Sequence, residues 1–422
     1  MKSILIILIC FSISAGFAQF DILEKVKDKV EEKAEEKTDE AIDKTIDEAT
    51  ENQDEEKKDE NSAEEKSEDE GNISEKSSET TKEEELKSFS KYDFIPGDQV
   101  LFYEDFSQDN IGDFPALWNT NSSGEVVTLN NYPGHWFQVG NTGVFLPDTK
   151  GSFGENFTLE YDLVYAPTAI TNLPDYNLEF ISGKGEGEII DAYVPGNGGC
   201  SFTMGAYSSS VTGWKDQNYG DISNNKDITI LNNNKSRKVR VSFSFQKQRV
   251  RFWLNEEKIY DLPRLLGSGL VIDRIRFSTG ETDDQKPYLY ITNLRVATGK
   301  PDMRSKLLTE GKLVTHGILF DVNSDKIKPE SYGTLKEIAN VLKENSSVKV
   351  KIVGHTDSDG NDASNLDLSK RRAASVKNTL NSEFGIDSSR METDGKGESQ
   401  PVTDNNSQEG KANNRRVELI KL

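Results

Sequence analysis

The sequence of 422 residues contains only two cysteines, Cys10 and Cys200. A chain with so few cysteines cannot rely on a disulfide framework, so its domains must be large enough to be stabilised by burying a hydrophobic core. Histidine is equally scarce: His135, His316 and His355 lie far apart, and no pair has the spacing of metal ligands. These two shortages argue against a small disulfide scaffold and against a histidine-based metal centre. We expect no cofactor.

Long hydrophobic runs are also missing, except at the amino terminus. There, residues 4–13 are almost entirely apolar, follow Lys2, and are followed by small residues before Gln19, a pattern typical of a cleaved signal peptide. The run is too short to span a bilayer. Cys10 follows the bulky Ile9, whereas a lipoprotein signal needs a small residue before its cysteine. We therefore expect residues 1–18 to be a signal peptide, and the mature chain to have no transmembrane span.

The chain has fewer basic than acidic residues, with 51 Lys and Arg against 73 Asp and Glu, and its net charge is −22. Residues 21–90 alone carry 28 acidic and 12 basic residues, which leaves only −6 for the rest of the chain. This acidity argues against nucleic acid as a partner, because phosphates would be repelled, and we expect none. Residues 19–91 have almost no aromatic side chains, so we expect an acidic low-complexity spacer. Apolar residues from Ile22 to Val30 recur at helical spacing, so the spacer is expected to be partly helical, with a weak coiled coil as the alternative.

Residues 92–300 show a different pattern, made of short alternating runs separated by Gly, Asn, Asp and Pro. In residues 158–165, Leu159, Tyr161 and Leu163 fall on one face, and residues 239–245 alternate cleanly. Further strands are expected over residues 249–254, 259–262, 272–277 and 288–291. Many strands at this spacing predict an all-β jelly-roll sandwich.

The same region resembles concanavalin-like or laminin-G-like sandwich modules. The resemblance rests on Tyr103-Glu104-Asp105-Phe106, on Gly112-Asp113-Phe114-Pro115 with Trp118, and on residues 251–255. It implies a β-sandwich that could bind glycans, since Trp118, Trp136, Trp214 and Trp253 could stack on sugars, although such residues more often belong to a core. A laminarinase-type glycosidase needs a third acid on the strand that carries Glu160 and Asp162, but Tyr165 stands there.

From residue 305 onwards the pattern alternates between strands and helices. Residues 317–320 are expected to form a strand, and Pro329 opens a helix at a position where its missing N–H costs nothing. Residues 348–352 alternate as a strand that runs into Gly354-His355-Thr356-Asp357, and a second helix is expected from about Leu368. Residues 417–422 form the last strand. This predicts a compact α+β domain with the order βαβαβ.

Several motifs in this region resemble those of OmpA-like peptidoglycan-binding domains. They are Phe320-Asp321-Val322-Asn323-Ser324, Gly354-His355-Thr356-Asp357, Asn365, Leu368-Ser369, Arg372-Ala373, Gly395-Lys396-Gly397 and Asn414-Arg415-Arg416-Val417-Glu418. The resemblance covers residues 312–422 almost without gaps. It implies that the ligand is the diaminopimelate of peptidoglycan stem peptides.

The resemblance also implies which residues bind. An arginine fork can hold a carboxylate through two parallel hydrogen bonds, and an aspartate can accept from an ammonium. Carried over from the family, Arg372 and Asp357 fill these two roles, and Asn323 and Asn365 supply supporting polar contacts. The start of the second helix would add N–H groups that favour an anion. Taken alone, Asp357 and Arg372 would be read as an ordinary surface ion pair.

Four further features favour structural roles over ligand or metal binding. Arg415 and Arg416 lead directly into the last strand, so a structural role is expected for both. Asp321-Val322-Asn323-Ser324-Asp325 fails as a calcium loop because Lys326 stands where the turn needs glycine. Asp357-Ser358-Asp359-Gly360-Asn361-Asp362 fits calcium better by composition, but such stretches are commonly plain turns.

The sequence therefore predicts a non-enzymatic, exported protein that binds peptidoglycan through residues 305–422. The expected location is the periplasm of a Gram-negative bacterium, in association with the outer membrane and cell wall. The sandwich would meet a second, unidentified partner, either protein or glycan. The alternative is a carbohydrate-binding sandwich that the C-terminal domain tethers to the cell wall.

Overall fold

The structure is a computed structural model that describes residues 92–168, 173–183, 196–215, 218–282, 284–299 and 302–422. The expected signal peptide, residues 1–18, and the expected acidic spacer, residues 19–91, lie outside the described residues. Within the described ranges, no helix is both long and apolar enough to cross a membrane.

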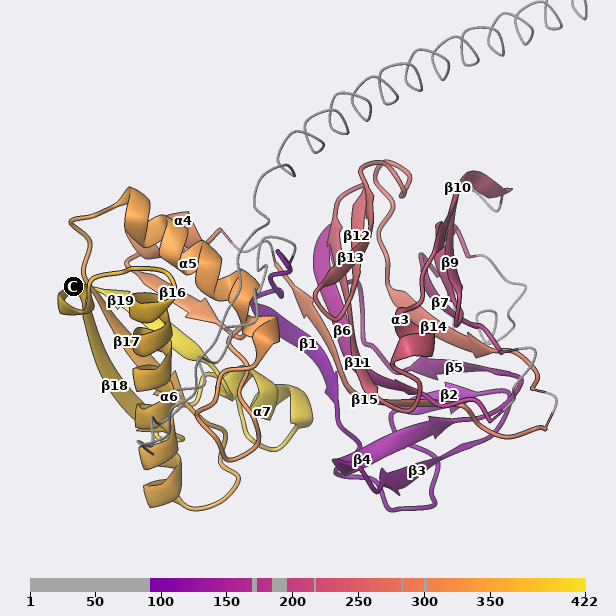
Figure 1. Cartoon of the computed structure of the whole chain (residues 1–422), viewed down its shortest axis with the longest axis horizontal. Helices are drawn as coiled ribbons and strands as arrows, with labels where there is room; N and C mark the ends of the chain where they lie inside the picture. Colours follow the sequence, from indigo (N-terminus) through magenta and orange to yellow (C-terminus); the bar gives the residue numbers. More distant parts are fainter. Residues whose placement is uncertain (1–91, 169–172, 184–195, 216–217, 283, 300–301) are drawn as a thin grey trace, which may run out of the picture. The chain divides into compact units, whose positions relative to one another are not determined.

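Two antiparallel sheets, called the sandwich below, form the first part of the described chain (Figure 1). The larger sheet has the order β13-β12-β11-β6-β15-β4-β3, and β1 pairs with β15. Its strands are β1 (Gln99–Glu104), β3 (Gly124–Leu129), β4 (Tyr132–Val139), β6 (Asn156–Tyr165), β11 (Lys238–Gln246), β12 (Arg249–Leu254), β13 (Glu257–Leu262) and β15 (Leu289–Thr298).

The second sheet has the order β10-β9-β8-β7-β14-β5-β2. Its strands are β2 (Trp118–Thr120), β5 (Gly143–Pro147), β7 (Tyr176–Ile181), β8 (Gly198–Met204), β9 (Ser208–Lys215), β10 (Asn218–Asp227) and β14 (Arg274–Thr279), and a short helix, α3 (Ile230–Asn233), follows β10. Side chains from both sheets share one apolar core. The finer assignment of the sandwich as a jelly roll stays a prediction.

Strand β6 shows how the alternating sequence builds this core. Leu159, Tyr161 and Leu163, which the sequence places on one face, are fully buried between the sheets. Glu160 and Asp162 point to the opposite face, yet they are also buried. Because these two side chains are buried on the outer face of the sheet, another part of the protein must cover that face. Buried carboxylates also need polar or charged partners.

The C-terminal domain, as the term is used below, runs from α4 (Met303–Leu308) to β19 (Val417–Lys421). Its sheet has the order β16-β19-β17-β18, in which β17 and β18 run parallel and the other pairs antiparallel. The remaining elements are β16 (Lys312–Thr315), η1 (Pro329–Ser331), α5 (Tyr332–Glu344), β17 (Val350–His355), α6 (Asp362–Ser382), η2 (Ser388–Arg390), β18 (Met391–Gly397) and α7 (Gln408–Asn414).

Several boundaries in this domain differ from the sequence prediction. The first strand is Lys312–Thr315, whereas residues 317–320 contribute only an isolated bridge between Phe320 and Ile327. Helix α6 begins at Asp362, well before the expected Leu368, because the side chain of Asn361 caps it by accepting from the Ser364 amide. The strand β18 and the helix α7 extend the expected βαβαβ order.

The sandwich and the C-terminal domain belong to one compact unit, residues 85–422. The side chain of Asn413 in α7 joins them: its amide donates to the Val100 carbonyl and its carbonyl accepts from the Val100 N–H, both at 3.1 Å. Asn413 thereby satisfies backbone groups of β1 that would otherwise be left unpaired. This contact brings β1 alongside the region where the sequence places the binding residues.

Candidate functional site

A cavity of about 410 Å³ lies where the carboxyl end of β17, helix α6 and the loop after residue 319 meet the sandwich. All four residues expected to bind, Asn323, Asp357, Asn365 and Arg372, line it. Residues that are far apart in the chain are therefore brought together. The volume falls in the range typical of pockets that hold small ligands.

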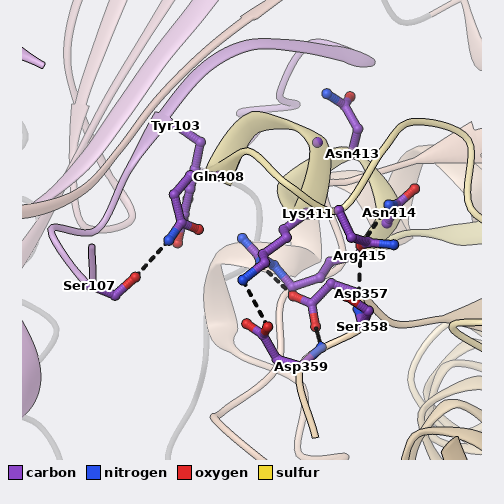
Figure 2. A network of polar contacts seen from close by, with 12 residues as sticks. Tyr103, Ser107, Asp357, Ser358, Asp359, Gln408, Lys411, Asn413, Asn414 and Arg415 are labelled. Atoms are coloured by element: carbon purple, nitrogen blue, oxygen red, sulfur yellow. Dashed lines mark hydrogen bonds and ion pairs between the residues drawn. The ribbon is translucent and has the colours of Figure 1, made fainter.

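Asp357 lies just past the end of β17 and is only 8% exposed. Its Oδ2 atom is 2.6 Å from Nη1 of Arg415, and its Oδ1 atom accepts from the Asp359 N–H at 3.1 Å (Figure 2). The carboxylate is thus oriented and held at the wall of the cavity. It is suited to accept from a cationic group of a ligand.

Arg372 lies near the middle of α6, because the helix begins earlier than the expected Leu368. Its guanidinium donates to the carbonyl oxygens of Ser324 at 3.0 Å and Asp321 at 3.4 Å, and lies over the Phe320 ring, 4.8 Å from the centroid. Burial lowers the pKa of Arg372 to about 10, although the charge of Asp357 opposes this shift. The side chain remains charged at neutral pH.

The ion pair that the sequence suggested is therefore not the one observed. Among the described residues, Asp357 pairs with Arg415, while Arg372 is fixed by backbone carbonyls and an aromatic ring. Asp357 and Arg372 still influence each other electrostatically. Two guanidiniums thus flank one carboxylate at this end of the cavity, whereas the lining as a whole carries both acidic and basic side chains.

The two asparagines hold the loops around the cavity. Nδ2 of Asn365 donates to the Asp359 carbonyl at 3.0 Å and to Oε2 of Glu398 at 2.5 Å, and reaches the Asp357 carbonyl at 3.4 Å. Asn323 is exposed and has φ of 53°, a left-handed conformation that asparagine tolerates better than most residues. Asn365 therefore orients the loop that carries Asp357, and Asn323 shapes the opposite rim.

Sequence reasoning assigned Arg415 and Arg416 the same structural role, but the structure separates them. Arg416 is buried, pairs with Glu418 at 2.9 Å and donates to the Gln400 carbonyl, as a structural residue would. Both residues belong to the cavity lining, but Arg415 is the one that pairs with Asp357. The alternation of side chains next to a strand could have revealed this difference, because adjacent residues face opposite sides.

Tyr103, in β1 of the sandwich, is a second cavity residue that sequence reasoning missed. The Arg415 guanidinium carbon lies 5.0 Å from the centroid of the Tyr103 ring, and the Tyr103 hydroxyl donates to Oδ1 of Asn293 at 2.9 Å. Figure 2 shows Tyr103 and Ser107 beside the residues of α7 and the Asp357 loop. No pattern in the sequence linked Tyr103 to the C-terminal motifs.

The loop from Asp357 to Asp362 was the better calcium candidate by composition. In the structure its acidic and amide groups have protein partners: Asp357 binds Arg415, Oδ1 of Asp359 is 2.8 Å from Nζ of Lys411, and Asn361 caps α6. Within the part of the chain that the structure describes, no group of three or more His, Cys, Asp or Glu could hold a metal ion.

The four tryptophans of the sandwich are buried. Trp118 and Trp253 pack against phenylalanines, and Trp136 packs against Tyr132. The core interpretation therefore applies to all four, and none of them presents a free ring to a sugar. Glu160 and Asp162 are held by arginines of the same sheet: Arg295 lies 2.9 Å from Glu160, and Arg240 lies 3.0 Å from Asp162.

Comparison with known proteins gives matches to the C-terminal part of the chain. Residues 319–415 match the OmpA family. Outer membrane porin F of Pseudomonas aeruginosa is 45% identical over 101 residues, which are 24% of this chain and 29% of the relative. The probable lipoprotein YiaD of Escherichia coli is 42% identical over 104 residues, 25% of this chain and 47% of the relative. The matches thus span less than half the length of these two relatives.

Two further similarities concern proteins named as lipoproteins. The outer-membrane lipoprotein YfiB of Pseudomonas aeruginosa is 41% identical over 103 residues, 24% of this chain and 61% of the relative. The crystal structure of the peptidoglycan-associated lipoprotein from Burkholderia pseudomallei is 30% identical, and the match covers 25% of this chain and 88% of that one. The TM-score of this match is 0.24.

Proposed function

Residues 319–415 of this protein form an OmpA family domain, and from this premise we propose that the protein is a non-covalent, peptidoglycan-binding component of the cell envelope. The ligand in this proposal is the diaminopimelate of stem peptides, bound by Asp357 and Arg372 with support from Asn323 and Asn365. The observation that carries the proposal is the convergence of these four residues on one cavity.

The chemistry of the ligand matches the charges of the cavity. The free end of diaminopimelate carries a carboxylate and an ammonium on one carbon. Arg372 supplies the planar fork for the carboxylate, and Asp357 accepts from the ammonium. Because Arg415 already pairs with Asp357, the ammonium would share that carboxylate, while Arg415 adds a second positive charge near the ligand carboxylate.

The proposal is one of binding rather than catalysis. Each polar group of the site is suited to hold a charge in place, and the relatives bear the names of porins and lipoproteins. Because several of those names refer to the outer membrane, we place this protein in the envelope of a Gram-negative bacterium. The division into residues 1–18, 19–91, 92–300 and 305–422, with the acidic spacer between signal and sandwich, is part of the same proposal.

The carbohydrate-binding alternative is weakened by the burial of the four tryptophans. It assumed exposed aromatic faces on which sugars could stack, and all four tryptophan rings are instead buried within the protein. A second partner for the sandwich remains part of the proposal, without a more specific identity.

The test is co-sedimentation of the full chain with purified diaminopimelate-type peptidoglycan. Asp357→Asn and Arg372→Ala should each weaken binding by about 2–5 kcal/mol, since each removes one side of a charge pair with the ligand. The matched control is Arg371→Ala, because Arg371 is the neighbouring residue but its half-exposed side chain pairs with Asp367 and Asp325 away from the cavity lining.

The expected result is that the wild type and Arg371→Ala sediment with peptidoglycan, while the two site variants, folded by circular dichroism, stay in solution. Equal sedimentation of all four proteins would place the binding site elsewhere. Failure of the wild type to sediment would refute the proposed ligand.

A further inference from the structure

We propose that the sandwich forms the second wall of the binding cavity, and that Tyr103 is a ligand-positioning residue supplied by it. The stem-peptide end would then be bound between two domains, not on the surface of the C-terminal domain alone. This inference rests on the proposed function and deepens it, because it adds residues to the same site.

The cavity lining is the first observation. Besides the C-terminal residues, it includes Tyr103, Asp105, Glu160, Asp162, Arg240, Asn293 and Arg295, all from the sandwich. These residues come from the outer face of the larger sheet, which explains why charged side chains are buried there. The C-terminal domain covers this face but leaves a cavity over it, so a ligand held by Asp357 would also meet the sandwich.

Unpartnered polar atoms are the second observation. Arg240 is 8% exposed and Thr356 is 5% exposed, yet Nε of Arg240 and Oγ1 of Thr356 are buried without a hydrogen-bond partner. Both residues line the cavity, one from each domain. Buried polar groups are nearly always satisfied in native proteins. Each wall of the cavity therefore carries a polar side chain that is not fully paired within the protein.

The third observation is that the second wall is fixed in place. Asn413 is bonded to both backbone groups of Val100, Nε2 of His316 lies 3.0 Å from the Asn413 carbonyl oxygen, and Nε2 of Gln408 donates to Oγ of Ser107 at 2.6 Å. These contacts hold β1, and with it Tyr103, against α7. Tyr103 then restrains Arg415 by stacking, and Arg415 in turn orients Asp357.

A cavity enclosed between two domains admits the end of a ligand more readily than the middle of a polymer. An amino-acid end with a free carboxylate and ammonium can enter, whereas a continuous polymer strand would have to pass between the domains. We therefore expect the full chain to bind free meso-diaminopimelate itself. The face of the Tyr103 ring should contribute through Arg415, since a cation over an aromatic face gains attraction when it is partly removed from water.

The experiment is isothermal titration of the full chain with meso-diaminopimelate. Tyr103→Leu keeps apolar bulk but removes the aromatic face, and should weaken binding about tenfold. Tyr103→Phe keeps the ring and should bind like the wild type, a rescue that a merely structural role of the hydroxyl bond to Asn293 would not give. Tyr207→Leu, at an exposed tyrosine of the sandwich outside the cavity lining, is the matched control.

Each outcome is decisive because Asp357→Asn is measured in parallel. If the wild type binds, Asp357→Asn does not, and Tyr103→Leu binds as well as the wild type, the proposed function stands and the second wall is refuted. Tighter binding by Tyr103→Leu would also refute it, and would show that the sandwich obstructs the site. If Asp357→Asn binds as well as the wild type, the proposed site itself is wrong.

Discussion

Glu104, the last residue of β1, is a carboxylate that folding removes from water. It is 2% exposed, and its Oε1 atom accepts from the Phe106 N–H at 2.8 Å. Phe106 has φ of 59°, so this bond holds a strained left-handed turn directly after β1. Burial raises the pKa of Glu104 to about 7; the Phe106 N–H opposes the shift, and the nearby carboxylates of Asp109 and Asp105 add to it.

This raised pKa makes stability depend on pH in a defined direction. The folded state holds the Glu104 proton more tightly than the unfolded chain, whose carboxyl has an ordinary pKa of 4.5. The free energy of unfolding should therefore decrease as the pH rises from about 4.5 to about 7, and then level off. Glu104→Gln keeps the acceptor oxygen without the charge, so it should stabilise the protein at pH 8 by up to about 3 kcal/mol.

Thermal unfolding of the full chain at a series of pH values measures this effect. The melting curves of wild type and Glu104→Gln should coincide at pH 4 and diverge towards pH 8. Glu257→Gln, at an exposed position of β13, should follow the wild type throughout. Parallel pH profiles of the wild type and Glu104→Gln would show that Glu104 does not titrate in this range.

At the scale of elements, the placement of α6 decides the geometry of the site, because α6 carries both Asn365 and Arg372. The helix packs closely on β17 and β18 through two glycines. A Cβ atom on Gly354 would lie 2.2 Å from the Ser369 carbonyl oxygen, and one on Gly395 would lie 2.4 Å from the Lys370 nitrogen. Both of these neighbours are backbone atoms, so the helix could accommodate a side chain only by moving.

Gly354→Ala should consequently affect both stability and binding. Overpacking of this kind typically costs about 1–3 kcal/mol, and the displaced α6 would move Arg372 away from Asp357. We expect a lower melting temperature together with weaker sedimentation with peptidoglycan. Gly280→Ala is the control, because the nearest atom to its Cβ would be the Asp175 carbonyl oxygen at 3.7 Å, an ordinary contact. If Gly354→Ala is destabilised but binds peptidoglycan as well as the wild type, the exact position of α6 does not determine ligand recognition.

The elements also show what a sequence can and cannot predict. Alternation correctly indicated β6, β11 and β12, because apolar side chains alternate with other residues along each strand, even though both faces of β6 and β11 are buried. The start of α6 was placed too late, because its first residues, Asp362 to Asn365, include no large apolar side chain. Their only signal is the capping residue Asn361. The strand expected at residues 317–320 was wrong, because the sheet pairs β16 with β19 instead.

Only the part of the candidate site that belongs to the C-terminal domain was predictable from the sequence. Asn323, Asp357, Asn365 and Arg372 stand in motifs that their spacing made visible, and the structure brings all four to one cavity. Tyr103 could not be found, because its place depends on how β1 meets α7, a long-range packing contact that leaves no periodic trace in the sequence. Its partner Arg415 stood within a motif, but its role depends on the same packing.

At the scale of the whole molecule, the segment that precedes β1 joins the sandwich to the C-terminal domain. Phe94 is 1% exposed, and its ring packs edge-on against Trp253 of β12 with the centroids 5.4 Å apart. Its backbone lies against Gly333 of α5, where a Cβ atom would approach the Phe94 carbonyl oxygen to 2.3 Å. Phe94 therefore contacts both domains, and together with Asn413 it should couple their unfolding.

Phe94→Ala tests this coupling. Truncating a buried phenylalanine typically costs about 3–5 kcal/mol, and here the loss would fall on the contact between the domains rather than inside either core. Scanning calorimetry of the full chain should show one main transition for the wild type and two for Phe94→Ala. Phe114→Ala removes a half-buried ring that packs on Phe137 within the sandwich, so it should lower the transition temperature without splitting the transition. A single transition for Phe94→Ala would mean that the other contacts, Asn413 with Val100 and Tyr103 with Arg415, suffice to keep the two walls of the cavity together.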